Sequence, residues 1–435
     1  MSESLVEELV SDIFRFITKQ NSSRHHNGLL VKKHSEHLTK LGDISFPGSS
    51  RSWQPYLDNT STPSEVETVL QRVGNDADSI VKESKNWKLS VRSSLEIKDR
   101  IHLFLERPRA ICGGLLEAKK NSVVIAENIN NNISDSVLLD PLCEEMSCVT
   151  SLRLKSLTKT METLYCLSES CQEFKPSIFL TSKSSSESSG RCKILCGTVL
   201  NSKTNLKETN ISADDFIKLR QNEMTLIAQH KYGVRVAADS KWKEFLLHLG
   251  ESAAAFELLQ TKPSSAVKIN FDTSSGTSKG AAFILYNCAR LETMLKTFNE
   301  KVQEGIYPPL PKIEDIDFTL LNQEDEWSLV YNFILGFPLL LRQCVDVGEN
   351  SCEFRPHLIC GYLCSMVRVF SQYYRRVRIL TFCLLQRPST GTHRLCQFMK
   401  RAGPAEDGRR LRNRRAAGRR ITSWKRTGYA LHVAR

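Results

Sequence analysis

Apolar residues recur at helical spacing through the last third of the chain. In 281–300 they step by four and three residues, at Ile284, Cys288, Leu291, Leu295 and Phe298. In 358–377 they step in the same way, at Ile359, Leu363, Val367, Phe370, Tyr374 and Val377. Such spacing places each set along one face of a helix. Because short turns marked by proline join the helices of this region, we expect an antiparallel helical bundle over residues 281–380.

The earlier part of the chain mixes helical and extended patterns. Helices are indicated by "SLVEELVSDIFRFITKQ" near the N-terminus, by 152–167 and by 212–230, where Ser212 suits an N-cap. The segments "WKLSVRSSL" and "RIHLFLE" indicate strands. The Asn-rich stretch 121–145 is expected to be irregular, and "TSKSSSESSG" (181–190) has the composition of a flexible linker.

Charge is distributed unevenly along the chain. The 435 residues carry a net charge of +12, and residues 381–435 alone hold 14 Lys and Arg against two Asp and Glu. The first 380 residues are therefore neutral overall, so a specific grip on nucleic acid must come from local patches. The Arg-rich tail could bind RNA non-specifically or act as a nuclear signal, or it could be a disordered segment without such a role.

Composition indicates a cytoplasmic protein. No run reaches the roughly 18 apolar residues that a membrane span needs, and the acidic, amphipathic opening "MSESLVEELV" is unlike a secretory signal. The 14 cysteines are scattered without a C-x-x-C pair, as expected for reduced, mostly buried thiols. We therefore expect a cytoplasmic chain with no membrane partner, and the basic tail leaves a nuclear location open.

Four stretches could hold an ion or a phosphate, and each also has a plain structural interpretation. A histidine-rich stretch lacks the paired ligands of a zinc site; its histidines are His25, His26, His34 and His37. The cysteines at 192 and 196, and at 360 and 364, fit buried structural thiols better than a redox pair. "SSGTSKGAAF" lacks the spacing of a phosphate-binding P-loop. We expect no metal and no cofactor.

Aromatic and basic side chains gather in the two C-terminal helices. Phe283, Tyr286 and Arg290 fall together roughly 100–160° around the first helix from its apolar stripe. In the second helix, the face opposite the stripe carries Gly361, Ser365, Arg368, Gln372 and Arg375. Such groups could stack on unpaired bases and bind phosphates, or they could pack against neighbouring helices. The candidate RNA-binding residues are Phe283, Tyr286, Arg290, Arg368, Tyr373, Arg375 and Arg376.

Three segments in register carry a family pattern: "FILYNCARLETML", "EDEWSLVYNFILGFP" and "RPHLICGYLCSMVRVFSQYYRRVRIL". Together they resemble the DALR anticodon-binding domain of class I arginyl-tRNA synthetases. The first is similar to the family's aromatic-x-x-Tyr-Ala-x-Ala-Arg helix and departs from it at Asn287 and Cys288. The resemblance implies a helical anticodon-binding fold with RNA contacts on this helix. After Leu380 the resemblance stops, and the end of the chain diverges from the family.

Both ATP-site signatures of those synthetases are missing. Cys148, Thr150 and Ser151 stand where the His-x-Gly-His signature would be, and Lys203 and Lys207 lie near the second without its Lys-Met-Ser-Lys pattern. About 50 residues separate Arg153 from Lys203. That length is too short for a doubly wound nucleotide-binding sheet, whose βαβ units need roughly 30 residues each. We therefore expect neither aminoacylation nor any other enzyme activity.

A narrower resemblance implies a specific role. "YNCARL", "GIYPPLP" and "DFTLL" are similar to segments of non-catalytic vertebrate relatives of these synthetases. That resemblance implies an adaptor that binds arginine tRNAs and supports 3-methylcytidine formation in the anticodon loop. A partner, a methyltransferase-like enzyme, would supply the chemistry and the S-adenosylmethionine. The alternative is a helical protein-interaction scaffold that has lost RNA binding, which the neutral body favours.

These inferences predict a mainly α protein in five parts. They are an N-terminal α/β domain of unknown function, an irregular linker with a degenerate synthetase remnant, a helical synthetase-like remnant, a truncated DALR-like bundle and a basic, disordered tail. The expected bounds are 1–120, 121–200, 201–280, 281–380 and 381–435.

Overall fold

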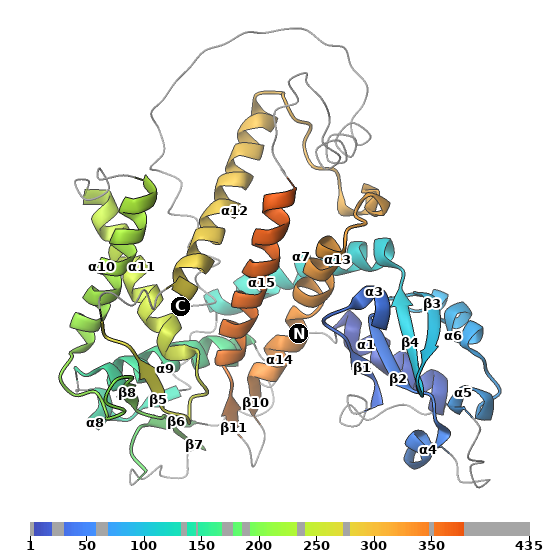
Figure 1. The fold of residues 1–435 in the computed structure, drawn as a ribbon, viewed down its shortest axis with the longest axis horizontal. Coiled ribbons are helices and arrows are strands. Elements are labelled where there is room, and N and C mark those ends of the chain that lie inside the picture. Colours follow the sequence, from blue (N-terminus) through green and yellow to red (C-terminus); the bar gives the residue numbers. More distant parts are fainter. Residues whose placement is uncertain are drawn as a thin grey trace. The chain divides into compact units, whose positions relative to one another are not determined.

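The computed structural model describes residues 4–19, 30–57, 68–131, 137–144, 147–167, 177–184, 192–232, 240–272, 279–347 and 352–377. The chain divides into two compact units. Unit 1 comprises residues 1–123, 308–339 and 372–404, and unit 2 comprises residues 124–307, 340–371 and 405–435. As the sequence predicts, the described fold is mainly helical and includes an α/β part at the N-terminus (Figure 1). No helix in the described ranges is long and apolar enough to cross a bilayer.

Unit 1 is built on a four-stranded sheet in the order β1-β2-β4-β3, in which all neighbouring strands are antiparallel. The strands are β1 (Lys32–Lys33), β2 (Ile44–Pro47), β3 (Val91–Ile97) and β4 (Arg100–Leu105). The predicted strands are thus confirmed as the β3–β4 hairpin. Short helices α3 (Leu38–Leu41), α4 (Ser50–Trp53), α5 (Val69–Arg72) and α6 (Ala77–Glu83) connect the strands. Gly42 has φ +66°, and a side chain there would meet the Leu103 carbonyl, so only glycine fits.

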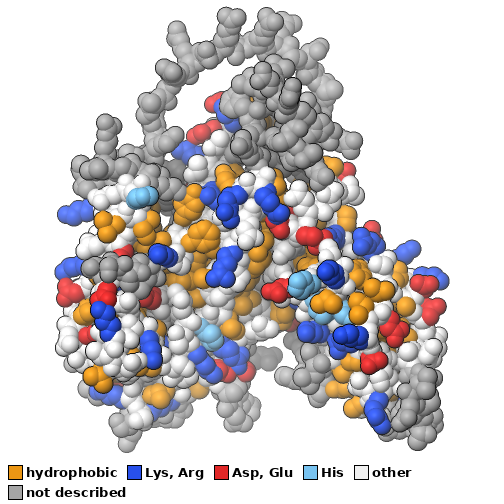
Figure 2. Space-filling model, viewed as in Figure 1, with side chains coloured by type: hydrophobic (Ala, Val, Ile, Leu, Met, Phe, Trp, Pro, Cys, Tyr) orange, Lys and Arg blue, Asp and Glu red, His pale blue; other side chains and the backbone are white. Residues whose placement is uncertain are grey.

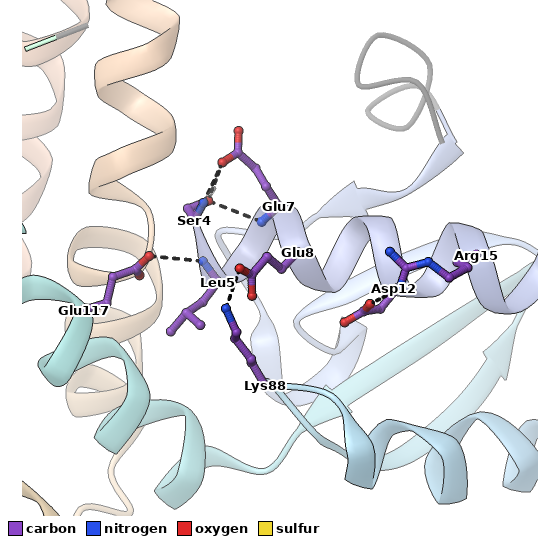
Figure 3. Close-up of polar contacts among 8 residues, drawn as sticks. All are labelled: Ser4, Leu5, Glu7, Glu8, Asp12, Arg15, Lys88 and Glu117. Carbon is purple, nitrogen blue, oxygen red and sulfur yellow. Dashed lines mark hydrogen bonds and ion pairs between the residues drawn. The ribbon is translucent and has the colours of Figure 1, made fainter. Parts of the chain in front are cut away.

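The predicted N-terminal helix is α1 (Leu5–Thr18). Its first turn is closed by a capping box, in which Glu7 N donates to Ser4 Oγ at 3.3 Å and Ser4 N donates to the Glu7 carboxylate at 3.0 Å (Figure 3). Leu5 N donates to Glu117 of α7 (Arg107–Asn131), and Lys88 pairs with Glu8 at 2.6 Å. These contacts hold the polar side of α1, while its apolar side packs into the core of unit 1.

Part of the predicted bundle packs into the core of unit 1 instead. This part includes α13 (Glu324–Ser328) and the π-helical turn η7 (Leu329–Ile334), which carry the fully buried Trp327 and Tyr331. Trp327 Nε1 donates to Asp43 Oδ1 at 2.7 Å, and the Tyr331 hydroxyl donates to the Asp43 carbonyl at 2.6 Å. Burial raises the pKa of the Asp43 carboxyl to about 6. Burial also lowers the pKa of Lys33, whose ammonium lies 4.7 Å from the centre of the Tyr331 ring, to about 8.

Unit 2 contains two small parallel sheets. One has the order β5-β6-β7, formed by β5 (Val137–Leu139), β6 (Ile178–Thr181) and β7 (Cys192–Leu195). The other pairs β8 (Val199–Asn201) with β9 (Val267–Ile269). The short helix α8 (Pro141–Glu144) follows β5. The expectation of irregular structure in 121–145 is wrong over its first part, because α7 continues to Asn131. Asparagine is only a moderately poor helix former, so a helix already under way can extend through it.

The longer helices between residues 149 and 303 pack on these sheets or on one another. They are α9 (Val149–Leu167), α10 (Ala213–Tyr232), α11 (Ser240–Leu259) and α12 (Lys279–Gln303). Ser212 caps α10 as predicted, since its Oγ accepts a hydrogen bond from Asp215 N at 3.1 Å. Figure 1 shows α10 and α11 packed as a helical hairpin. Gly250 permits their close approach, because a side chain there would overlap Gln221.

The C-terminal helices meet around a small apolar cavity in unit 2. α14 (Phe337–Cys344) and α15 (His357–Arg376) are joined by the antiparallel hairpin of β10 (Val345–Val347) and β11 (Cys352–Phe354), so the chain reverses direction between them. The cavity has a volume of about 60 Å³, and α9, α11, α12 and α15 all contribute to its lining. Ile284 of α12 and Ile359 of α15 are buried there. The apolar stripes predicted for both helices therefore face the interior at this level.

Candidate nucleic-acid interface

The exposed side of α12 carries the first three candidate residues. Phe283 is 37% exposed, whereas Tyr286 and Arg290 are half-buried. The predicted apolar stripe is covered in the first half of the helix, where Ile284 is buried. In the second half Leu295 is 54% exposed, so the stripe emerges there at the surface.

Tyr286 and Arg290 contact each other directly, which confirms that they share one side of the helix. Arg290 Nη2 donates to the Tyr286 hydroxyl at 2.6 Å, and the guanidinium carbon lies 4.5 Å from the centre of the ring. Arg290 Nη1 also donates to Oδ1 of the buried Asn287 at 3.2 Å. Asn287 Nδ2 in turn donates to the Phe283 carbonyl at 2.8 Å. The result is a half-exposed surface of one aromatic ring and one planar cation, a combination that suits a nucleotide base and its phosphate.

The face of α15 opposite its apolar stripe is exposed, as the sequence predicts. Its exposed positions are Gly361, Ser365, Arg368, Gln372 and Arg375. Arg368 and Arg375 are two helical turns apart, about 10 Å along the axis. Guanidinium groups bind phosphate oxygens through paired N–H donors. This face therefore presents two aligned groups that can bind a phosphate backbone.

An open hollow lies at the end of α15 in unit 1. Its volume is about 410 Å³, and its lining is Asp325, Gln372, Arg375 and Arg376. Arg376 forms an ion pair with Asp325 of α13. Because the Arg376 side chain is exposed, this ion pair stabilises the fold by little. A phosphate group can therefore compete with the carboxylate for Arg376.

Tyr373 is held differently from the arginines around it. It is half-buried, and its hydroxyl donates to Glu326 Oε1 at 3.1 Å. Burial and the neighbouring Glu326 carboxylate raise the pKa of Tyr373 above its ordinary value. This ring is fixed by α13, and its contact with RNA stays a prediction.

Figure 2 shows how side chains of each kind are distributed over one face of the molecule. Lys and Arg side chains gather on the visible face over α12 and α15, with hydrophobic side chains between them. A basic surface with aromatic groups is the arrangement that single-stranded RNA loops require. The sequence missed Asn287, Asp325 and Glu326, which orient the candidate arginines and Tyr373. Asn287 gave a signal as a departure from the family pattern and Glu326 as a match to it, whereas Asp325 gave none.

The residues that stand at the position of the first synthetase signature make structural contacts. Thr150 and Ser151 are buried, and Thr150 Oγ1 accepts a hydrogen bond from Val199 N at 3.2 Å. Nearby, the fully buried Arg153 donates to five backbone carbonyls, at distances of 2.6–3.3 Å. They belong to Gly197, Leu258, Thr261, Lys262 and Ser265. Burial lowers the pKa of Arg153, but arginine remains charged. The charged guanidinium therefore holds the five carbonyl groups together through hydrogen bonds.

The residues near the second signature position also make structural contacts, but these lie at the surface. Lys203 forms a 2.7 Å ion pair with Asp272, and both side chains are exposed. Lys207 pairs with Leu200 as an isolated β-bridge. These lysines are thus placed in a turn and a strand edge.

Histidines and thiols of the described residues form no group of three or more ligands suited to a metal ion. His34 is buried with its ring stacked 5.5 Å from His102, and His25 and His26 lie outside the described residues. Of the four thiols predicted to be buried, Cys196 and Cys360 are buried, and Cys192 and Cys364 are half-buried. Burial raises the pKa of Cys196 to about 11 and that of Cys360 to about 12, so both thiols are protonated and unreactive at neutral pH.

Comparison with known sequences places a named domain over these helices. The profile of the DALR anticodon binding domain matches residues 284–396. The match contains most of α12 and all of α15, and it continues past the end at 380 that the sequence predicted. Residues 378–396 of the match lie outside the described part of the chain.

Curated relatives agree with this match. DALR anticodon-binding domain-containing protein 3 of Danio rerio is 31% identical over 196 residues, which are 43% of this chain and 34% of the relative. The protein of the same name from Rattus norvegicus is 31% identical over 191 residues, 43% of this chain and 35% of the relative. Arginine–tRNA ligase of Borreliella burgdorferi is 22% identical over 222 residues, 49% of this chain and 34% of the ligase. The chain thus spans about a third of the length of these relatives.

Among solved structures, arginyl-tRNA synthetase of Thermus thermophilus aligns with 99% of this chain and 98% of its own, with a TM-score of 0.48 and 9% identity. The domain assignment itself depends on the sequence match at 284–396 and on the relatives at about 31% identity. The chain therefore contains a DALR anticodon binding domain and is similar to the DALR anticodon-binding domain-containing protein 3 of vertebrates.

Proposed function

We propose that this chain is a non-catalytic adaptor that binds arginine tRNA and presents it to a methyltransferase-like enzyme. The observation that carries the proposal is the DALR anticodon binding domain over 284–396. The name of that domain describes binding to an anticodon, and the relatives include enzymes named arginine–tRNA ligase. Arginine tRNA is therefore the RNA that we assign to the chain.

The described surface supports RNA binding by this domain. An anticodon loop displays unpaired bases and a bent phosphate backbone, which proteins recognise through stacking and cationic contacts. α12 offers the exposed Phe283 beside the Tyr286–Arg290 pair. α15 offers Arg368 and Arg375 on an exposed face. The two kinds of group suit the two parts of the loop.

The adaptor role is supported by the structure beside the position where the first signature would be. A buried Arg153 that binds five carbonyls holds loops together and presents no group to a substrate. The chemistry is therefore assigned to a partner: transfer of a methyl group from S-adenosylmethionine to N3 of a cytidine in the anticodon loop. The proposal includes action in the cytoplasm, where the reduced thiols of the chain would persist.

Filter binding with arginine tRNA tests the RNA-binding part. Full-length chain, a chain ending at residue 396 and the double variant Arg368→Ala/Arg375→Ala would be titrated with arginine tRNA and with the same tRNA bearing a swapped anticodon. Arg92→Ala is the matched control, because Arg92 is an exposed arginine on β3 and lies outside residues 284–396. Thermal melting of each variant checks that it folds.

We expect anticodon-dependent binding that survives removal of 397–435 and falls about tenfold or more in the double variant, while Arg92→Ala binds normally. Binding that disappears with the tail and ignores the anticodon would instead support the scaffold alternative, which the overall neutrality of residues 1–380 favours. The partner role needs a second measurement. Copurification with the methyltransferase, and loss of 3-methylcytidine from arginine tRNA in cells without the chain, are expected. Unchanged 3-methylcytidine would refute the adaptor role alone.

A further inference from the structure

A short proline-rich segment follows α12 and belongs to none of the helices. It reads Tyr307-Pro308-Pro309-Leu310-Pro311-Lys312, and the described chain has neither helix nor strand there. Leu310 is 64% exposed, and Ile306 just before the segment is 50% exposed. The candidate RNA-binding surface does not use these residues, so their exposure needs a separate explanation.

Covalent chemistry restricts most of this segment to extended or polyproline II conformations. Each proline ring fixes its own φ near −65°. Tyr307, Pro308 and Leu310 each precede a proline and are therefore confined to extended or polyproline II conformations. Lys312 has φ −61° and ψ 149°, within the scatter of an ideal polyproline II residue. These restrictions favour the recognition conformation before any partner binds.

Both ends of the segment are anchored, which preserves this conformation. On the N-terminal side, the Tyr307 ring stacks on Phe298 of α12 at 5.9 Å, and Tyr307 N donates to the Lys301 carbonyl at 3.1 Å. On the C-terminal side, Ile313 packs against the core of unit 1. A ligand that is already ordered loses little conformational entropy on binding, so its affinity is higher.

The threefold repeat of a polyproline II helix divides the segment into three edges. One edge carries Pro308 and Pro311, which are half-buried. The second carries Pro309 and Lys312, which are both exposed, and the third carries the exposed Leu310. One edge therefore rests on the protein, and the two others face solvent.

The backbone of the segment is also open to a partner. Among the described residues, the carbonyl oxygens of 308–311 accept no hydrogen bond, whereas the Lys312 carbonyl accepts one from Asp315 N. Exposed carbonyls on a polyproline II helix are the acceptors that Trp and Tyr side chains of a recognition groove use, while the proline rings fill slots between aromatic rings. The shape, conformation and polarity of the segment thus all suit a ligand for an aromatic recognition groove.

We propose that Pro308–Pro311 is a docking motif for a WW-type domain, a small module whose groove is lined by aromatic side chains. The length of the segment selects this class. Six residues, Tyr307–Lys312, lie outside helix and strand before the next helical turn, and they span about 16 Å from first to last at about 3.1 Å per residue. The short WW groove can bind this length, whereas the longer SH3 groove needs more extended ligand. The docking motif would recruit a protein partner independently of tRNA.

Fluorescence anisotropy of a dye-labelled WW domain that binds Pro-Pro-Leu-Pro peptides, titrated with the full chain, tests the proposal. A labelled SH3 domain serves as the comparison probe. The variants are Pro309→Ala and Leu310→Ala, both at exposed positions. Pro55→Ala is the matched control, because Pro55 is an exposed proline in a 3₁₀ turn with no proline run. Thermal melting and tRNA binding are measured for every variant.

We expect saturable binding of the WW domain, a tenfold or greater loss with Pro309→Ala and a severalfold loss with Leu310→Ala. Pro55→Ala, the melting temperatures and tRNA binding should not change. Absence of saturable binding, or equal binding by Pro309→Ala, would overturn the docking motif. Tighter binding by the SH3 domain than by the WW domain would overturn the assignment to the WW class. Failure of either kind leaves the tRNA-binding proposal intact, because the variants are measured in both assays.

Discussion

Replacing Arg153 with methionine should destabilise unit 2 strongly. The guanidinium is fully buried and donates to carbonyls at the end of α11 and in the loops before β8 and β9. Gly197 and Ser265 approach so closely that a side chain on Gly197 would overlap the Ser265 carbonyl. Arg153 Nη1 donates to both of these carbonyls, at 2.6 and 2.7 Å. Methionine has a similar length but donates no hydrogen bond, so these inward-facing oxygens lose their donor.

The size of the effect follows from two opposing contributions. A buried polar group that loses its partner costs about 1–3 kcal/mol, and five carbonyls would give far more if none were rehydrated. Removal of the buried charge offsets part of this cost. Measured losses for breaking such buried charged networks are about 3–5 kcal/mol. For a unit of this size each kcal/mol shifts the melting temperature by about 2–4 °C, so we expect a decrease of about 6–20 °C.

Urea and thermal unfolding followed by circular dichroism measure this loss. Lys155→Met is the control, because Lys155 is an exposed residue on the same helix, and it should change stability by less than about 0.5 kcal/mol. Arg153→Lys should be intermediate, since lysine keeps the charge but has three donors in place of five. An Arg153→Met chain within about 1 kcal/mol of the parent would refute the view that this position holds the loops together.

Three further predictions concern other regions. Arg290→Ala should lower tRNA binding in the filter assay and cost less than about 1 kcal/mol of unfolding free energy, because Arg290 and its partner Tyr286 are only half-buried; a large fall in melting temperature would make Arg290 a structural residue. The folded pKa of Asp43, about 6 against an ordinary 3.8, means that its stabilising contribution is present below about pH 4 and lost as the pH rises through 6. This amounts to about 3 kcal/mol, and urea titrations of Asp43→Asn should lack that slope. Ser212→Ala removes the cap of α10 and should cost about 1 kcal/mol in the same urea assay; no loss would show that the capping bond contributes nothing.

Local rules account for what the sequence determined. The apolar periods located α12 and α15, and they also located the exposed face that carries Arg368 and Arg375. The capping serine placed the start of α10. The four-residue spacing of Tyr286 and Arg290 put their side chains in contact. These features depend on residues within one or two helical turns, where helix geometry fixes the neighbours.

The tertiary structure decided which surfaces these elements cover. Trp327 lies 284 residues from Asp43 in the chain, yet the two share a hydrogen bond in the core of unit 1. No periodic pattern predicts that contact. The prediction from sequence therefore placed residues 308–339 entirely within the bundle. The same is true of Arg153, which looks like an ordinary helix residue until loops more than 40 positions away place their carbonyls around it. Local spacing sets the direction of a side chain, but its partner depends on the packing of distant segments, and that packing emerges only when the whole chain has folded.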